Sequence, residues 1–164
     1  MTTIVPAQTR ANYKIIADLA NLIWTEHYTP IIGEQQVAYM LEKFQSALAV
    51  EDQVEKGIMY YLLLYQDTHV GYFSFSKNEE SLFLSKLYVL NSVRGNGIGR
   101  AALSFIEAQA KELDLKKIKL TINKFNTNSI KMYEKMGFVN IEAIVQNIGN
   151  GYVMDDYVLE KVIK

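Results

Sequence analysis

A glycine-rich segment near the middle of the chain carries the strongest chemical signal. It reads Arg94-Gly95-Asn96-Gly97-Ile98-Gly99-Arg100 and follows a strand-like stretch that ends at Leu90. Three glycines at alternate positions let the backbone approach a ligand closely. Helical periodicity begins at Ile98, and the first turn of a helix carries unpaired N–H groups and a partial positive charge. The pattern therefore predicts a loop that binds an anion, and we expect a diphosphate.

Two other nucleotide-binding motifs fit this segment less well. A Walker A loop requires Lys followed by Ser or Thr after its last glycine, but Arg100-Ala101 stands there. A dinucleotide-binding fingerprint requires an acidic residue at the end of the next strand, but that strand ends in Asn123-Lys124. We therefore expect neither motif.

Periodicity predicts the elements that must position this loop. Strands are expected at 2–5, 58–65, 70–76, 82–90, 117–123, 138–145 and 152–161, and helices at 8–25, 34–47, 98–114 and 126–136. Tyr28-Thr29-Pro30 is expected to end the first helix, because proline disfavours helix in the residue before it. Residues 48–56 are expected to form a loop.

The resulting order, β-α-α-β-β-β-α-β-α-β-β, predicts an α/β chain (α+β, mixed sheet). Strands 58–65, 70–76 and 82–90 are expected to form an antiparallel meander. Asn150-Gly151 is expected to close a hairpin between the last two strands. Strands 82–90 and 117–123 are expected to be parallel, because a right-handed helical crossover joins them. Ligands bind at the carboxyl ends of such strands.

Composition limits the class of protein. The chain has 164 residues, of which 49% are hydrophobic, so we expect a single domain over residues 1–164. Cysteine is absent, which excludes disulfides and suits the cytoplasm. No signal peptide or membrane-spanning run is apparent, so we expect a cytoplasmic protein with no membrane partner. A net charge of −1 gives no sign of nucleic-acid binding.

Local charge is less even than the total. Basic residues outnumber acidic ones between Arg94 and Lys135, and the reverse holds between Glu26 and Lys56. Two interpretations stay open: solvated helix faces, or an anionic ligand on the second stretch and a cationic one near the first.

The motif Arg94-x-x-Gly97-x-Gly99, set between strand and helix, resembles the Gln/Arg-x-x-Gly-x-Gly/Ala signature of the GNAT superfamily of acetyl-CoA-dependent N-acetyltransferases. Leu87-Tyr88-Val89 is similar to the end of the family's fourth strand, and Tyr133 with Gly137-Phe138 matches its Tyr-x-x-x-Gly-Phe. The resemblance is strong from Leu82 to Phe138 and agrees in element order elsewhere. It implies a central mixed sheet that is splayed between strands four and five.

The resemblance also implies acetyl-CoA as the cosubstrate and no metal. Backbone N–H groups after Arg94 would bind the diphosphate, with a charge-assisted bond from that arginine. The implied cofactor-binding residues are Leu87, Tyr88, Val89, Arg94, Gly95, Asn96, Gly97, Ile98, Gly99, Arg100, Asn123, Asn126, Asn128, Ser129 and Tyr133. Tyr133 is implied to be the catalytic acid that protonates the departing thiolate, and the alternative for a helix tyrosine is core packing.

The implied reaction is direct attack of an amine on the thioester, which requires a base. Candidates for contact with the substrate are Glu26, His27, Tyr28, Tyr72 and Asp156. Strand alternation puts Asp155 and Asp156 on opposite faces, so that one of them faces a cleft or a packed side. A carboxylate there would bind a cationic amine or serve as the base, and a structural salt bridge is the alternative role. Lys86 stands where the family often has a carboxylate.

We expect the acceptor to be a primary amine of a small cationic molecule, similar to a polyamine. Two alternatives stay open. The chain is a protein or peptide N-acetyltransferase, or it is a non-catalytic acyl-CoA-binding regulatory module. A homodimer through the last strands is a further open expectation.

Overall fold

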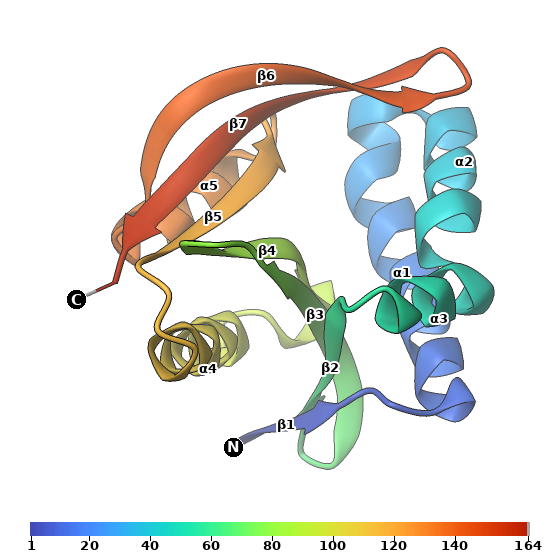
Figure 1. Cartoon of the computed structure of the whole chain (residues 1–164). Helices are drawn as coiled ribbons and strands as arrows, with labels where there is room; N and C mark the ends of the chain where they lie inside the picture. Colours follow the sequence, from blue (N-terminus) through green and yellow to red (C-terminus); the bar gives the residue numbers. More distant parts are fainter. Residues whose placement is uncertain (164) are drawn as a thin grey trace. The chain divides into compact units, whose positions relative to one another are not determined.

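The computed structural model describes residues 1–163 and shows a mixed α/β chain (Figure 1). Its elements are β1 (Thr2–Pro6), α1 (Arg10–Ile32), α2 (Glu34–Gln45), α3 (Ala47–Glu55), β2 (Met59–Tyr65), β3 (Thr68–Lys77), β4 (Ser81–Val89), a 3-10 turn (Asn91–Val93), α4 (Ile98–Glu112), β5 (Lys117–Asn123), α5 (Thr127–Lys135), β6 (Val139–Gly149) and β7 (Tyr152–Val162). The strands form one seven-stranded sheet in the order β1-β2-β3-β4-β5-β7-β6. The predicted fold class is therefore confirmed.

The chain divides into two compact units. Unit 1 is Met1–Ser76 with Lys86–Ile106, and unit 2 is Lys77–Ser85 with Glu107–Lys164. Each unit is described by itself below. That the whole chain acts as a single domain stays a prediction. No helix within residues 1–163 is both long enough and apolar enough to span a membrane.

Unit 1 is built on antiparallel strands, which include the β2–β3 part of the predicted meander. β1 pairs with β2 from Thr2↔Tyr65, and β2 pairs with β3 from Met59↔Phe75. The β2–β3 ribbon is apolar on both faces because both are covered. Stacked Tyr61 and Phe73 meet Phe105 of α4 on one face, and on the other face Tyr60 and Tyr72 form hydrogen bonds with Gln45 of α2.

Helix α1 is longer than the sequence predicts. The expected end near Thr25 is wrong, because the helix continues through Pro30 to Ile32. Tyr28 continues the buried face past the expected stop and packs on Trp24, and this packing outweighs the local cost of proline in the final turns. The helix ends at Gly33, whose φ of 87° suits glycine and whose N–H donates to the carbonyl of Thr29 at 3.0 Å.

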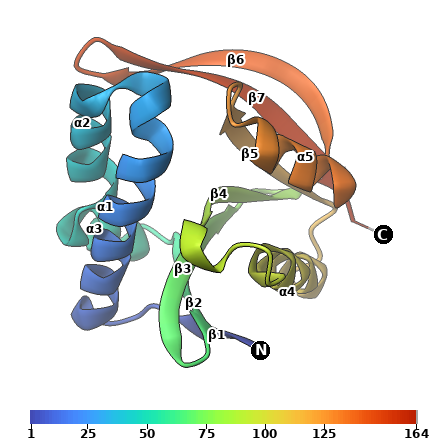
Figure 2. The same ribbon diagram turned by 180° about the vertical axis from the view of Figure 1, so that it is seen from behind.

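The expectation of a loop at residues 48–56 is also wrong, because most of this stretch lies in α3. Ser46 caps the helix, its side chain accepting from the N–H of Ala49 at 3.1 Å. Val50 is its one fully buried residue. Figure 2 shows α1, α2 and α3 together on one side of unit 1.

Unit 2 holds β5, β7 and β6 in antiparallel pairing, with α5 against them (Figure 2). The β6–β7 hairpin turns at Asn150 and Gly151, with φ of 54° and 79°, which confirms the predicted hairpin. The predicted parallel pairing of β4 with β5 is confirmed over Ser81–Phe83 and Lys117–Lys119.

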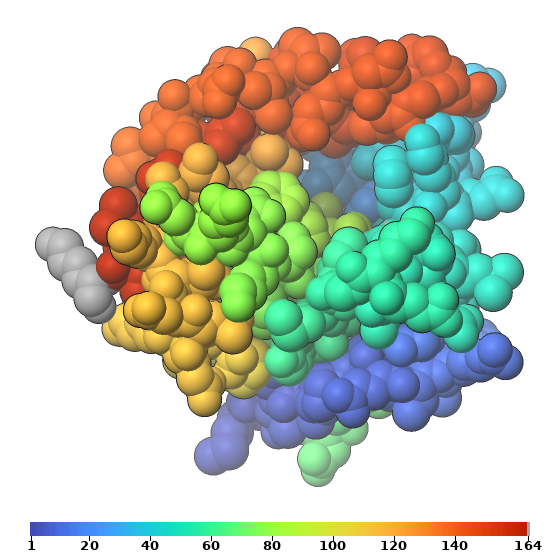
Figure 3. All heavy atoms as spheres, viewed as in Figure 1, coloured from blue at the N-terminus to red at the C-terminus, as the bar shows by residue number. Residues whose placement is uncertain are grey.

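Strand β6 forms an edge of the sheet and displays apolar side chains. Val139, Ile141 and Val145 are exposed on it, and so is Val153 on β7. In Figure 3 the spheres of β6, in orange, form a continuous surface of unit 2. The predicted homodimer through the last strands stays a prediction.

Candidate active site

The glycine-rich loop connects β4 to α4 in an open conformation. Gly95 and Gly97 have φ of 86° and 75°, a region that suits glycine, and a Cβ on either would meet no heavy atom within 4 Å. The first helical bond runs from Ala101 N–H to the Gly97 carbonyl at 3.0 Å. The N–H groups of the residues between them therefore lack helical acceptors, as an anion-binding loop requires.

Side chains around the loop fix its shape and its charge. Asn96 Nδ2 donates to the Val93 carbonyl at 2.8 Å, and the Tyr65 hydroxyl donates to Asn96 Oδ1 at 3.3 Å. Arg94 and Arg100 are exposed. Neither arginine forms an ion pair with any residue in 1–163. The first turn of α4 contains no acidic residue, so the local field favours an anion.

An aromatic cluster lies beside the end of β4 in unit 1. The hydroxyls of Tyr28 and Tyr88 are 3.0 Å apart. The ring centroid of Tyr88 lies 5.4 Å from that of Trp24 and 5.7 Å from that of Tyr72. The His27 ring packs edge-on to Tyr28 at 4.8 Å. Three predicted substrate residues, His27, Tyr28 and Tyr72, are thus brought together around a predicted cofactor-binding one, Tyr88.

Glu26 lies at the same end of α1. Its Oε1 accepts from Asn91 Nδ2 at 3.3 Å, in the turn that follows β4. This bond connects a predicted substrate residue to the segment that leads into the loop.

Tyr72 is the most deeply buried of the predicted substrate residues. Burial raises its pKa well above the usual value, with a smaller contribution from Tyr60. Its hydroxyl donates to Gln45 Oε1. Gln45 Nε2 in turn donates to the Tyr60 hydroxyl at 3.1 Å, and that hydroxyl donates to Gln53 at 2.6 Å. This network joins β2 and β3 to α2 and α3.

Lys86 is a titratable residue that sequence analysis did not assign to the site. It lies on β4, and its Nζ is 5.7 Å from the centroid of the Tyr60 ring. Burial lowers its pKa to about 8. Alternation along β4 puts Lys86 on the face of Tyr88, and that spacing is the signal that places it beside the aromatic cluster.

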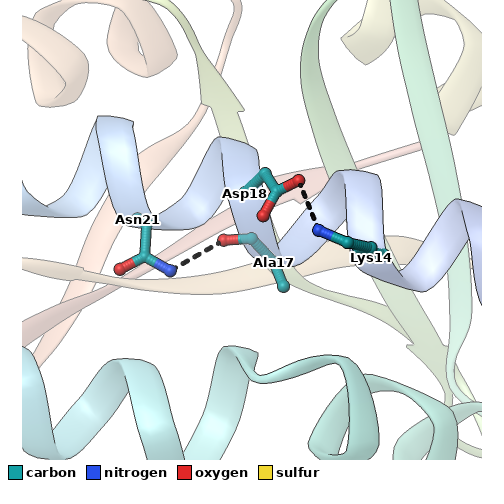
Figure 4. Close-up of polar contacts among 4 residues, drawn as sticks. All are labelled: Lys14, Ala17, Asp18 and Asn21. Carbon is teal, nitrogen blue, oxygen red and sulfur yellow. Dashed lines mark hydrogen bonds and ion pairs between the residues drawn. The ribbon is translucent and has the colours of Figure 1, made fainter.

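A groove of about 480 Å³ lies between α1 and α2 in unit 1. Its lining contains two carboxylates and no lysine or arginine: Asn21, Thr25, Thr29, Glu34, Val37, Ala38, Leu41, Glu42, Gln45 and Ser46. Asn21 donates from Nδ2 to the Ala17 carbonyl at 3.2 Å, and Figure 4 shows this contact on α1. Thr29 Oγ1 is buried and has no hydrogen-bond partner in the described part of the chain, residues 1–163. The groove is therefore electronegative, with an apolar part formed by Val37, Ala38 and Leu41.

In unit 2, the end of β5 leads directly into α5. Asn123 Oδ1 accepts from the Phe125 N–H at 2.9 Å, and the Asn123 carbonyl accepts from the Asn126 N–H at 3.0 Å. Both asparagines are buried, whereas Asn128 is exposed and Ser129 is half-buried. The turn thus fixes the direction in which α5 starts.

Tyr133 lies on α5 and is 6% exposed. Its ring meets Phe138 edge-on at 5.3 Å. Gly137 ends the helix with φ of 98°, which brings the Phe138 N–H to the Tyr133 carbonyl at 3.0 Å. The Tyr-x-x-x-Gly-Phe sequence therefore has a structural reason: glycine makes the turn and phenylalanine packs on tyrosine.

The neighbouring aspartates of β7 have different environments. Asp155 pairs with Lys124 at 2.8 Å, and its side chain is 46% exposed. Asp156 is 4% exposed, and its Oδ2 accepts from Gln146 Nε2 at 3.0 Å. Its Oδ1 is buried and has no hydrogen-bond partner within residues 1–163. Burial, followed by the charge of Asp155, raises the pKa of Asp156.

The predicted site residues fall in both units. The loop, the end of β4 (residues 86–89) and the aromatic cluster belong to unit 1, and Asn123, Asn126, Tyr133 and Asp156 belong to unit 2. Across residues 1–163, no cluster of three or more His, Asp or Glu side chains is arranged to hold a metal ion.

Comparison with known families gives one match that covers most of the chain. The model of the acetyltransferase (GNAT) family matches residues 16–138. This range includes the loop between β4 and α4 and ends at Phe138.

Solved structures share the fold at low sequence identity. A PaiA N-acetyltransferase from Thermoplasma acidophilum, in complex with coenzyme A, is 17% identical with a TM-score of 0.83, covering 99% of each chain. The ribosomal-protein-S18-alanine N-acetyltransferase from Escherichia coli is 15% identical with a TM-score of 0.75, covering 100% of this chain and 95% of that one. A GNAT family acetyltransferase from Elizabethkingia anophelis with acetyl-CoA bound is 21% identical with a TM-score of 0.68, covering 98% and 97%.

Proposed function

Because the chain belongs to the GNAT family of acetyltransferases, which use acetyl-CoA, we propose that it acetylates a primary amine of a small cationic molecule in the cytoplasm. The observation that carries the proposal is the loop after β4. Its positive-φ glycines, exposed arginines and free helix-start N–H groups suit the diphosphate of acetyl-CoA. Leu87, Tyr88 and Val89 would offer backbone groups to the amides of the pantetheine arm.

The chemistry is acyl transfer without a covalent enzyme intermediate. The neutral amine attacks the thioester carbonyl, a C–N bond forms, and the C–S bond breaks to release the thiolate of coenzyme A. Tyr133 donates its hydroxyl proton to that thiolate, and the nitrogen of the new amide loses a proton that restores the hydroxyl. The support for this role is the position of Tyr133 on α5, where packing against Phe138 fixes its ring.

The electronegative groove of unit 1 supports a cationic acceptor. Its volume of about 480 Å³ lies in the range of small-molecule sites, and Glu34 and Glu42 are its only charged lining residues. An amine-bearing cation gains from these carboxylates, whereas an anionic acceptor is repelled.

A thiol-release assay with acetyl-CoA tests the proposal. The panel contains aliphatic diamines and triamines, amino acids, and peptides with free N-termini. We expect release with the polycationic amines. Release with peptides alone would point to a protein acetyltransferase. Binding of acetyl-CoA without release for any amine would point to a regulatory module.

A further inference from the structure

Asp156 has one carboxylate oxygen that accepts no hydrogen bond within residues 1–163. One carboxylate oxygen is bonded to Gln146, and the other is buried with no donor within residues 1–163. A buried carboxylate oxygen without a donor costs free energy. Most buried polar atoms in proteins are hydrogen-bonded, so the second oxygen can accept from a donor that a ligand supplies.

Among residues 1–163, no lysine, arginine or histidine forms an ion pair with Asp156. In the register of β7, the residues opposite it are Asn123 on β5 and Ile144 on β6. On β6, the next residue on the same face as Ile144 is Glu142, which is opposite Val158, two residues from Asp156 along β7. Further along the same face, Glu160 is occupied by Lys117 and Lys119. The adjacent Asp155 is occupied by Lys124.

A donor that fits this oxygen must therefore be cationic or strongly polar and must come from a ligand. An ammonium group meets both needs, because it donates hydrogen bonds and neutralises the carboxylate. The end of β5 opposite Asp156 is also where Asn123 begins the turn into the helix of Tyr133. The carboxylate thus belongs to the same part of unit 2 as the proposed catalytic acid.

We propose that Asp156 binds the ammonium group of the acceptor and accepts its proton as the amine attacks the thioester. This inference rests on the proposed acetyl transfer and assigns its base. One N–H bond of the ammonium breaks and its proton goes to Asp156 Oδ1. The freed lone pair forms the C–N bond, and the C–S bond breaks as Tyr133 protonates the thiolate. The nitrogen of the new amide loses its second proton to the Tyr133 phenolate, which restores the hydroxyl, and Asp156 returns its proton to water.

The substitution Asp156→Asn tests this role, because the amide keeps the shape and can still accept from Gln146. We expect kcat/KM for a diamine such as 1,4-diaminobutane to fall by about 10²- to 10⁴-fold, the range of general-base catalysis. The rate of the variant should rise with pH, because solution must then supply the neutral amine. The acetyl-CoA affinity measured by calorimetry should not change.

The thermal midpoint separates a functional carboxylate from a structural one. A raised carboxyl pKa means that the carboxylate opposes folding above the folded pKa. Asp156→Asn should therefore keep or raise the midpoint at pH 7.5, and its advantage over the wild type should shrink as the pH falls. A midpoint that falls together with activity would overturn the proposal, as would turnover within threefold of wild type.

Asp155→Asn is the matched control. It removes a half-exposed carboxylate on the opposite face of β7, and we expect turnover within about twofold of wild type, because exposed ion pairs contribute little. If the wild type acetylates no amine, the proposed function fails. Binding of 1,4-diaminobutane in the presence of coenzyme A then tests Asp156 by itself, because only an amine-binding carboxylate makes that binding weaker in Asp156→Asn.

Discussion

Gly71 of β3 sits where no side chain fits. A Cβ at this position would lie 2.3 Å from the carbonyl oxygen of Tyr88 and 3.1 Å from the Cα of Val89. Ordinary contact begins at 3.4 Å, so in Gly71→Ala the β4 carbonyl must move by about 1 Å. Overpacking of this kind costs about 1–3 kcal/mol. At about 2–4 °C per kcal/mol, the thermal midpoint should fall by roughly 2–12 °C.

The same displacement should weaken the binding of acetyl-CoA. It moves the backbone of Tyr88 and Val89, which we propose to pair with the pantetheine arm. We expect calorimetry to show acetyl-CoA affinity reduced about tenfold, equivalent to ~1.4 kcal/mol.

Gly57→Ala separates stability from binding. Gly57 has φ of 101°, and its added Cβ would meet nothing within 4 Å. This variant should lose about 1–2 kcal/mol through backbone strain alone and bind acetyl-CoA as the wild type does. Undiminished affinity in Gly71→Ala, or equal weakening in both variants, would refute the reasoning.

Three further predictions concern charge and proton transfer. Arg94→Ala should weaken acetyl-CoA binding and reduce its dependence on salt in calorimetric titrations at two ionic strengths, because one charge-assisted bond to the diphosphate is lost; an unchanged salt dependence would contradict this role. Tyr133→Phe should bind acetyl-CoA normally but lower kcat by about 10²-fold or more, and full turnover in the thiol-release assay would remove Tyr133 as the acid. Lys86→Met should raise the thermal midpoint at pH 7, because it removes a buried charge. The gain should shrink as the pH rises from about 8 toward the ordinary pKa of lysine, since the folded wild type is then neutral at Lys86. A gain independent of pH would contradict the lowered pKa.

Local chemistry explains which parts of the fold the sequence predicts well. The glycines of the loop and of the β6–β7 turn need unusual backbone angles, and such needs are visible in a few consecutive residues. Strand patterns are equally local. The parallel pairing of β4 and β5 follows from the helix between them and the handedness of crossovers.

The missed elements depend on contacts far along the chain. Pro30 is a local signal to end the helix, but Trp24 and Tyr28 pack on Tyr88 of β4. This packing before Pro30 holds the chain in the helical path, and α1 continues to Ile32. Helix α3 buries only Val50, so its periodicity is too weak to notice. Its cap at Ser46 was the available signal.

The site shows the same division. The anion-binding loop is readable as a motif, because its function lies in its own backbone. From the sequence, Asp155 and Asp156 are predicted to lie on opposite faces of the last strand, but the pattern does not say which of them belongs to the site. Only the pairing of Asp155 with Lys124 and the burial of Asp156 distinguish them. Lys86 likewise acquires its lowered pKa from burial on the folded sheet, which no short segment specifies.

The most direct test of the central claim follows the backbone amides of the ¹⁵N-labelled protein while coenzyme A is added. We expect the largest chemical-shift changes at the amides from Gly95 to Arg100, at the start of α4. Saturable binding that leaves these amides unshifted, or no binding at all, would show that the loop does not bind coenzyme A.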